Sequence, residues 1–161
     1  EGCLIVTYRC NAKCYMCNTW QHPSKKEEEF APDIVNKLPD GLSFINITGG
    51  EPFLRSDIEL IIEKALRKTR RLVISTNGYF TDRIVKSASR FGNRIGFRVS
   101  IEGLPAANDE LRGIKNGFDN GIRTLTTLHS MGMKDIGFGM TVSDRNAKDV
   151  IELYRLANFI E

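Results

Sequence analysis

The sequence lacks long apolar runs, and it lacks a strong charge of either sign. Its 161 residues are 41% hydrophobic and 27% charged, with a formal net charge of +3. No run approaches the roughly 20 apolar residues that span a bilayer, so we expect no membrane helix and no membrane partner. Basic and acidic residues are interleaved in segments such as 25–29, which argues against a nucleic-acid partner. The length suits one compact domain.

Cysteine is also scarce, and its placement is the most informative feature of the chain. Cys10, Cys14 and Cys17 follow an apolar run with the spacing CxxxCxxC, and Cys3 lies alone inside that run. Three thiolates so close together can hold one polynuclear iron–sulfur cluster, because soft sulfur ligands suit iron. A [4Fe–4S] cube has four irons, so three thiolates leave one iron open to an exogenous ligand.

The cysteine spacing by itself leaves alternatives open. A structural zinc site usually has four nitrogen or sulfur ligands, so Cys3 or His22 would have to complete it. Disulfides could pair the four cysteines in three ways. Cysteines spaced so closely behind a buried strand are poorly placed to form disulfides. The sequence also has no signal-like apolar leader that would point to an oxidising compartment. We interpret Cys3 as a small buried hydrophobic side chain.

Strand-like and helix-like patterns alternate along the whole chain. Apolar runs rich in Val, Ile and Phe predict parallel strands, which are Cys3–Arg9, Ser43–Thr48, Arg71–Thr76, Ile95–Ile101 and Asp135–Val142. Helices are predicted between and after them, beginning at Pro32, at a capping box Ser56–Glu59, at Thr81 or Asp82, before Ile122 and near Asn146. The last helix is expected to bury Val150, Ile151, Leu153, Tyr154 and Ala157.

This pattern predicts an α/β fold of five parallel strand–helix units, arranged as a partial, TIM-barrel-like (β/α) barrel. Polar or glycine-rich groups follow every strand, and the strand ends of a barrel build its active site. These groups are Cys10 onward, Thr48–Pro52, Ser75–Gly78, Ser100–Glu102 and Thr141–Asn146. Each group alone could be an ordinary turn or helix cap. Their common edge favours one shared site.

With these motifs the chain resembles the radical S-adenosylmethionine (SAM) superfamily. The segment Cys10–Cys17 matches the cluster signature of that family, and Gly49–Pro52 matches its motif for the amino group of SAM. The segments 99–103, 108–113 and 117–118 resemble the branch that matures peptides and builds cofactors. The resemblance implies an enzyme whose [4Fe–4S] cluster reductively cleaves SAM. The resulting 5′-deoxyadenosyl radical would abstract hydrogen from a substrate.

The resemblance also implies roles for individual residues. Cys10, Cys14 and Cys17 would hold the cluster. Arg112 stands twelve positions after Ser100, a spacing at which this branch places an arginine on SAM. The ordinary alternative for Arg112 is a surface ion pair with Asp109 or Glu110. The residues expected to contact SAM are Met16, Gly49, Gly50, Glu51, Pro52, Thr76, Asn77, Ser100, Glu102 and Arg112.

Some positions depart from the family pattern. Met16 stands where an aromatic residue is usual, and methionine can offer a similar soft apolar surface. Glu102 stands where aspartate is usual, so its side chain is one methylene longer. Trp20 could shield the cluster, but we interpret it as a core residue.

Residues 1–161 are interpreted as one radical SAM core domain, truncated at both ends. The chain begins directly before a strand, and no sixth strand follows Glu161. An open fifth strand with exposed Ile136, Phe138 and Met140 would promote self-association. The expected partners are a small-molecule or peptide substrate and an electron donor such as flavodoxin or ferredoxin, in a reducing cytoplasm. The other readings are an iron–sulfur electron-transfer domain and a zinc-stabilised binding module.

Overall fold

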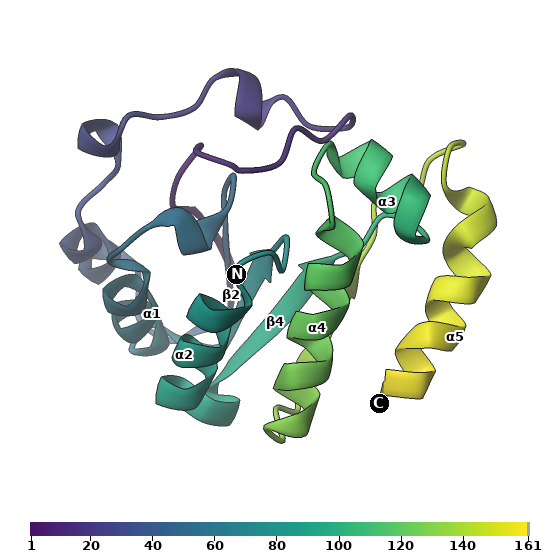
Figure 1. Cartoon of the computed structure of the whole chain (residues 1–161). Coiled ribbons are helices and arrows are strands. Elements are labelled where there is room, and N and C mark those ends of the chain that lie inside the picture. Colours follow the sequence, from purple (N-terminus) through teal and green to yellow (C-terminus); the bar gives the residue numbers. More distant parts are fainter. Residues whose placement is uncertain (161) are drawn as a thin grey trace.

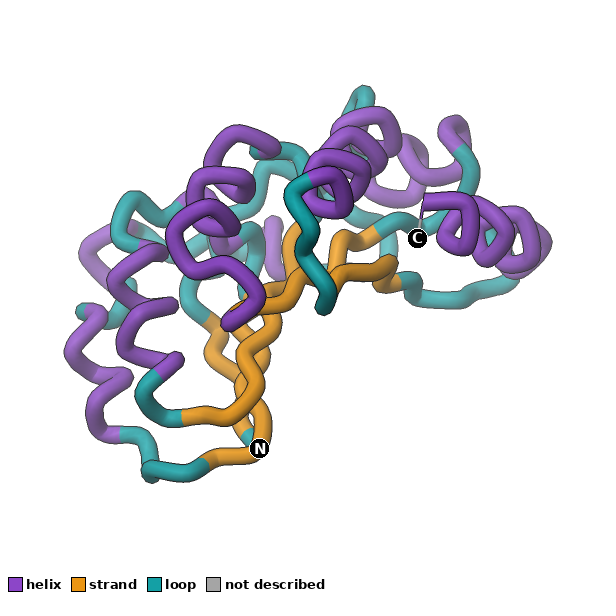
Figure 2. The backbone as a smooth tube through the Cα atoms, turned by 90° about the horizontal axis from the view of Figure 1, so that it is seen from below, coloured by secondary structure: helices purple, strands orange, loops and turns teal. Residues whose placement is uncertain are grey.

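A computed structural model describes residues 1–160 as one curved parallel sheet with helices against its convex face (Figures 1 and 2). The five strands pair in chain order, β1-β2-β3-β4-β5, and every pair is parallel. This confirms the predicted α/β fold of strand–helix units, with the sheet left open. The strands are β1 Gly2–Ile5, β2 Leu42–Thr48, β3 Thr69–Thr76, β4 Ile95–Ser100 and β5 Ile136–Gly139.

Eleven helical segments connect or follow these strands in the described chain. The α-helices are α1 Ile58–Leu66, α2 Thr81–Phe91, α3 Pro105–Arg112, α4 Gly117–Ser130 and α5 Val150–Ile160. The 3₁₀ turns of the first half are η1 Thr19–Gln21, η2 Lys26–Glu28, η3 Pro32–Lys37 and η4 Pro52–Leu54. The 3₁₀ turns of the second half are η5 Gly92–Arg94 and η6 Ala147–Asp149. None of the described helices is long and apolar enough to cross a membrane.

The two faces of the sheet differ in polarity, because successive side chains of a strand point to opposite sides. Ile45, Ile47 and Ile74 point toward the helices and belong to the main core. On the concave side the Ser75 hydroxyl donates to the Asn46 side chain at 3.0 Å. The helices therefore bury the convex face, and polar side chains occupy the concave face.

Cys3 is exposed, so its predicted burial is wrong. Leu4 packs against the main core, and its neighbour Cys3 must point to the other side of β1. Cys3 is paired in register with Asn46 of β2, so its side chain lies on the concave face, away from the helices. The apolar run at residues 3–6 did not reveal which of its residues would face outward.

Several predicted elements differ from the structure in extent or type. The first and last strands end at Ile5 and Gly139, earlier than predicted. The first predicted helix is the 3₁₀ turn η3, and the capping box is absent because Asp57 is the N-cap of α1 and makes no side-chain cap hydrogen bond. An unpredicted helix, α3, precedes α4 and ends at Gly113, which has a left-handed φ of 57°.

The β5–α5 end of the sheet has its own small core. Val99, Ile101, Leu125 and Leu153 form this second cluster. In α5 only Leu153 is fully buried, whereas Ile151 and Tyr154 are 58% and 65% exposed, so their predicted burial is wrong. Ile136, Phe138 and Met140 are half-buried against the same cluster rather than exposed. The backbone edge of β5 has no second partner in the described chain, and self-association there remains a prediction.

Candidate functional site

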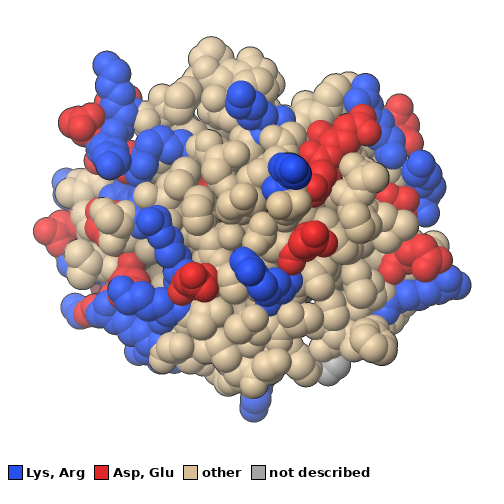
Figure 3. Space-filling view, in the orientation of Figure 1, with Lys and Arg blue, Asp and Glu red and all other residues tan. Residues whose placement is uncertain are grey.

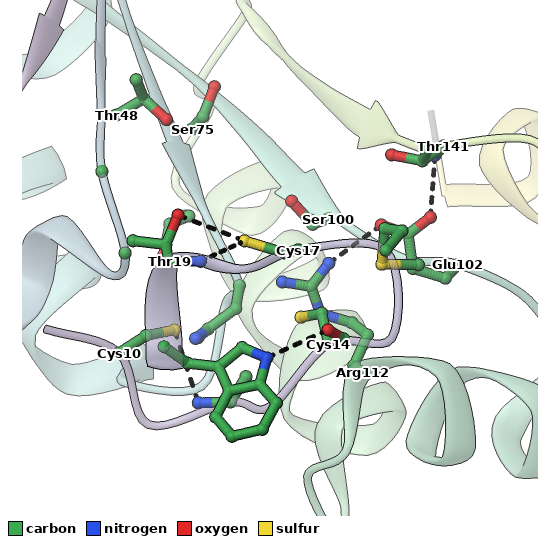
Figure 4. A pocket seen from close by; sticks show the side chains of 17 residues that line it. Cys10, Cys14, Cys17, Thr19, Thr48, Ser75, Ser100, Glu102, Arg112 and Thr141 are labelled. Carbon is green, nitrogen blue, oxygen red and sulfur yellow. Dashed lines mark hydrogen bonds and ion pairs between the residues drawn. The ribbon is translucent and has the colours of Figure 1, made fainter. Parts of the chain in front are cut away.

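A pocket of about 310 Å³ lies at the carboxyl edge of the sheet (Figure 4). It receives side chains from the segments after β1, β2, β3 and β4 and from the segment after β5. The shared edge predicted from the strand ends is therefore present. The lining residues are Cys10, Ala12, Cys14, Met16, Cys17, Thr19, Trp20, Thr48, Gly49, Gly50, Ser75, Thr76, Asn77, Ser100, Glu102, Arg112 and Thr141.

The three cysteines lie on residues 6–18, which we call the cysteine loop, and all three line the pocket. Two of their sulfurs accept backbone hydrogen bonds: the Ala12 N–H donates to Cys10 Sγ and the Thr19 N–H donates to Cys17 Sγ, each at 3.4 Å. Burial raises the pKa of the Cys10 and Cys14 thiols.

The cysteines do not converge on a single point. Among the described residues, no group of three or more His, Cys, Asp or Glu side chains is placed to hold one metal ion. A polynuclear cluster has a different requirement, because each of its thiolates binds a separate iron. The presence of all three cysteines in the wall of one pocket is compatible with that kind of ligand.

Buried Glu29 anchors the start of the cysteine loop, a contact that the sequence did not reveal. Its carboxylate accepts hydrogen bonds from Arg9 Nε at 2.7 Å and from the Thr7 hydroxyl. The side chain of Glu29 is only 7% exposed. In the sequence it ends a run of charged residues that is typical of a solvated surface, so no local signal identified it.

The far end of the cysteine loop is held by the C-terminus of α3. The N–H groups of Lys13 and Tyr15 donate to the carbonyls of Arg112 and Leu111, at 3.0 and 2.8 Å. Gly113 follows the last residue of α3, and a Cβ on Gly113 would lie 2.5 Å from the Lys13 carbonyl oxygen. Helix α3 thus satisfies its last carbonyls with the amides of the cysteine loop.

Gly49 and Gly50 extend the pairing of β2 with the chain after β1. The Gly50 N–H donates to the Thr7 carbonyl at 2.7 Å, and the Glu51 N–H donates to the Arg9 carbonyl at 2.8 Å. A Cβ on Gly50 would lie 2.2 Å from the Arg9 oxygen. The missing Cβ atoms therefore let the glycine turn and the cysteine loop pack backbone to backbone.

Glu51 lies beneath the pocket and does not line it. Its carboxylate is fully buried and accepts hydrogen bonds from Phe53 N–H, Thr76 Oγ1 and Asn77 N–H, at 3.0, 2.8 and 2.7 Å. Burial raises its pKa, and these hydrogen bonds oppose that shift. Pro52 is buried beside it. Glu51 therefore ties the end of β2 to the end of β3.

Arg112 and Glu102 form a buried ion pair in the pocket wall, with 2.9 Å between Nη1 and Oε1 (Figure 4). The other carboxylate oxygen of Glu102 accepts from the Thr141 N–H at 2.7 Å. Arg112 is 9% exposed, so it does not form the surface ion pair with Asp109 or Glu110. Arg112 Nε is buried and has no hydrogen-bond partner among the described residues.

Two asparagines complete the framework around Glu102. The Glu102 N–H donates to the Asn108 side chain at 2.8 Å, and Asn146 Nδ2 donates to the Glu102 carbonyl at 2.8 Å. Both asparagines are fully buried. Asn146 also donates to the Thr141 carbonyl at 3.0 Å. The ends of β4 and β5 and the start of α3 are therefore joined through one polar network.

Sequence reasoning missed part of the pocket wall. Trp20 is half-buried in the wall rather than in a core, and its Nε1–H donates to the Cys14 carbonyl at 3.1 Å. The hydroxyl residues Thr48, Ser75 and Thr141, which belong to the strand-end groups named in the sequence analysis, also line the pocket. The predicted residues Met16, Thr76, Asn77 and Ser100 all lie in the wall.

The fold and the site together define a partial (β/α) barrel with a cysteine-lined pocket at the carboxyl edge of its sheet. The chain belongs to the Radical SAM superfamily, whose sequence model matches residues 4–157. This confirms the resemblance drawn from the cysteine and Gly-Gly-Glu-Pro motifs.

Individual relatives agree with this membership. The chain is 33% identical over 158 residues to the Fe-coproporphyrin III synthase of Methanosarcina barkeri, which covers 94% of this chain and 39% of that protein. It is 29% identical over 157 residues to the mycofactocin maturase MftC of Mycolicibacterium smegmatis, which covers 94% of this chain and 40% of that protein. The chain thus spans about two fifths of the length of these curated relatives.

A solved structure confirms the fold independently. Streptococcus suis SuiB bound to S-adenosylmethionine matches with a TM-score of 0.79 at 18% identity, over 99% of this chain and 38% of that one. The likeness covers the whole sheet and its helices. It supports the partial, TIM-barrel-like description of the open sheet.

Proposed function

We propose that this chain carries the SAM-cleaving site of a radical SAM enzyme. The observation that supports this most strongly is the convergence of three cysteines, a glycine turn and a buried arginine on one pocket of about 310 Å³. When bound there, a [4Fe–4S] cluster would supply the electron for reductive cleavage of SAM, and the resulting 5′-deoxyadenosyl group would take hydrogen from a substrate. Cys10, Cys14 and Cys17 would hold the cluster.

The site fits such a group in three respects. Its donor set is three sulfurs, which suit iron. Two of the sulfurs already accept backbone N–H groups, and such hydrogen bonds to sulfur tune cluster potentials. The Arg112 Nε–H is a buried donor without a partner in the described chain, so it has an unfilled hydrogen bond to offer a ligand.

The protein's own residues would bind and orient SAM. Gly49 and Gly50 would present backbone groups to its amino end, and Arg112 offers a planar fork suited to its carboxylate. Ser100, Thr76 and Asn77 would contact the rest of the molecule from the strand ends. Glu102 has both carboxylate oxygens engaged with Arg112 and Thr141, so we assign it to holding Arg112 in place. Glu51 and Pro52 would act by fixing the rim.

A direct test is anaerobic reconstitution followed by assay of 5′-deoxyadenosine formation from SAM under a chemical reductant. The proposal predicts about four irons per chain, an absorbance near ~400 nm from sulfur-to-iron charge transfer, and product formation. An iron–sulfur electron-transfer domain would bind iron without cleaving SAM. A zinc-stabilised module would bind neither iron nor SAM.

The substrate class is proposed from relatives. One relative is named as a synthase of an iron tetrapyrrole and another as a maturase. We propose a small-molecule or peptide substrate, taken up at the carboxyl edge of the sheet, where the pocket lies. Transfer of deuterium from deuterated candidate tetrapyrroles or peptides into 5′-deoxyadenosine would separate the two classes.

A further inference from the structure

The segment between β5 and η6 contains a buried asparagine to which the proposed SAM site gives no role. Asn146 is fully buried, whereas its neighbours Asp144 and Arg145 are exposed. Connecting segments ordinarily run over the surface of a domain and keep their polar side chains in water. Burying an amide costs free energy unless the amide is hydrogen-bonded. The hydrogen bonds of Asn146 therefore indicate why this side chain points inward.

The Asn146 side chain makes four hydrogen bonds. Its Nδ2 donates to the carbonyl of Glu102 at 2.8 Å and to the carbonyl of Thr141 at 3.0 Å. Its Oδ1 accepts from the N–H of Ser143 at 2.6 Å and from the Ser143 hydroxyl at 3.1 Å. A carboxamide has two N–H donors and two acceptor lone pairs, so all of its hydrogen-bonding groups are used. Asn146 thus joins the end of β4 to the end of β5.

The two carbonyls that Asn146 holds belong to residues that hold Arg112. Glu102 Oε1 accepts from Arg112 Nη1 at 2.9 Å, and Glu102 Oε2 accepts from the Thr141 N–H at 2.7 Å. Both hydrogen bonds of this carboxylate persist only while Glu102 and Thr141 keep their present separation. Because Asn146 binds the backbone of both residues, it fixes that separation.

Asn146 acts from behind the pocket wall. Arg112, Glu102 and Thr141 line the pocket, whereas Asn146 is not one of the lining residues. Arg112 Nε is buried and has no hydrogen-bond partner in the part of the chain that the structure describes. Hydrogen bonds from an arginine to a carboxylate are directional, so a displaced guanidinium binds a carboxylate less well. A support for Arg112 therefore affects any ligand that this arginine binds.

We propose that Asn146 is a positioning residue of the SAM site. It joins the ends of β4 and β5, so that Glu102 keeps the guanidinium of Arg112 directed at the carboxylate of SAM. The proposal rests on the proposed function, because it requires Arg112 to bind SAM. Asn146 itself would contact neither SAM nor the cluster, and it would take no part in proton or electron transfer.

The first test uses hydrogen exchange in the cluster-free protein. The Thr141 N–H lies beyond the end of β5, and the Glu102 carboxylate is its acceptor. In Asn146→Ala the two strand ends are no longer joined, so this amide should exchange about tenfold faster relative to the core amides of β4. Nuclear magnetic resonance can follow this single amide without SAM or turnover.

Asn93→Ala is the matched control. Asn93 lies in η5 at the amino end of β4, and its side chain also bridges two backbone groups. It donates to the Gly132 carbonyl at 3.2 Å and accepts from the Lys134 N–H at 2.7 Å. Asn93→Ala should leave the exchange of the Thr141 amide unchanged, because these contacts lie at the opposite edge of the sheet.

The second test is calorimetry with SAM on the cluster-loaded protein. Asn146→Ala should raise the Kd about three- to thirtyfold without loss of iron, whereas Asn93→Ala should leave the Kd unchanged. In the Arg112→Ala background, Asn146→Ala should change the Kd by less than about twofold, because the residue through which it acts is absent. A merely structural effect would give the same factor in both backgrounds.

Altered long-range electrostatics would not explain such a difference. Neither asparagine substitution changes a charge. Figure 3 shows acidic and basic side chains interspersed over one face, with no large area of one sign that a local rearrangement would expose or cover. A change in SAM affinity therefore reports the geometry of the pocket wall.

If Asn146→Ala does not fold, Ser143→Ala provides the test. It removes only the hydroxyl that donates to Asn146 Oδ1, so it should raise the Kd about two- to fivefold, more than Asn93→Ala. An unchanged exchange rate at Thr141 would overturn the proposal, and so would an equal effect of Asn146→Ala in both backgrounds. A cluster-loaded wild-type protein that does not bind SAM would instead contradict the proposed function. The two failures are distinguishable, because the exchange experiment needs neither cluster nor SAM.

Discussion

Charged residues are buried at the carboxyl edge of the sheet and partly exposed toward its amino edge. At the carboxyl edge Glu51, Glu102 and Arg112 are at most 9% exposed, and the carboxylates accept several hydrogen bonds each. Toward the amino edge, Asp135 forms ion pairs with Arg71 and Arg98. The side chain of Asp135 is 30% exposed, that of Arg71 is 54% exposed and that of Arg98 is 32% exposed. Burying charge is costly unless it is paired, whereas an exposed ion pair costs and contributes little.

The difference in burial between the two edges indicates which edge of the sheet carries the functional site. A buried polar network gives geometric precision, because each donor and acceptor has few alternatives. In related barrels the carboxyl edge carries activity and the amino edge carries stability. Changes at the carboxyl edge should therefore alter ligand binding, and changes at the amino edge should alter only the free energy of unfolding.

The largest effect is expected from the cysteines. Replacing Cys10, Cys14 or Cys17 with Ala should each abolish the reconstituted cluster, because each removes one of three thiolates. Cys3→Ala is the matched control, since Cys3 is exposed on β1 and lies outside the pocket. Iron content and absorbance per chain measure the result. Equal iron loss from Cys3→Ala and Cys14→Ala would contradict this assignment.

The next largest effect is expected from Gly50→Ala. The added Cβ would overlap the Arg9 carbonyl at 2.2 Å, so the cysteine loop must move away from the end of β2. We expect a loss of about 1–3 kcal/mol in the free energy of unfolding, together with loss of SAM binding. Gly139→Ala is the control, because a Cβ there meets nothing within 4 Å. Denaturant unfolding and calorimetry with SAM should separate the two variants.

Arg112→Ala should weaken SAM binding by about 1–3 kcal/mol in the cluster-loaded protein, the scale of a lost charge-assisted hydrogen bond. The cluster itself should remain, because no thiolate is removed. Glu102→Gln should cause a smaller loss of affinity, since it loosens Arg112 without removing it. Calorimetry that finds unchanged SAM affinity in Arg112→Ala would show that the arginine is only structural.

The smallest effect is expected near the amino edge. Hydrogen bonds from Arg71, followed by those from Arg98, lower the pKa of Asp135 to about 2 against the opposing effect of burial. Because the pKa of Asp135 is lower in the folded state than its ordinary value of 3.8, its ionised carboxylate stabilises the folded state at pH values above 3.8. This contribution to the free energy of unfolding is lost as the pH falls toward 2. Asp135→Asn should therefore reduce the free energy of unfolding by about 1 kcal/mol at pH 7. The difference from wild type should shrink below pH 4, and SAM affinity should not change.

Features coded by local spacing could be predicted from the sequence. The CxxxCxxC spacing and the strand-end motifs located the pocket, and the alternation of elements gave the parallel sheet in its correct order. Each of these signals lies within a few consecutive residues. The family match over residues 4–157 agrees with them.

Features that depend on distant partners could not be predicted. Glu29 resembles a solvated charge until it meets Arg9, twenty positions earlier. Arg112 pairs with Glu102 instead of its helix neighbours, because the end of β4 lies closer to its guanidinium. Cys3 is exposed because its side chain lies on the concave face of the sheet, beside Asn46 of the next strand. Trp20 lies in the pocket wall, where its N–H donates to the Cys14 carbonyl.

The most direct test of the account is the electron paramagnetic resonance spectrum of the reduced, reconstituted protein, recorded with and without SAM. A cluster held by three thiolates at the carboxyl edge leaves one iron open, so SAM should bind that iron and change the spectrum. The same change should persist in Asp135→Asn, which alters only the opposite edge. A spectrum that SAM leaves unchanged would contradict the assignment of the cysteine pocket as a SAM site.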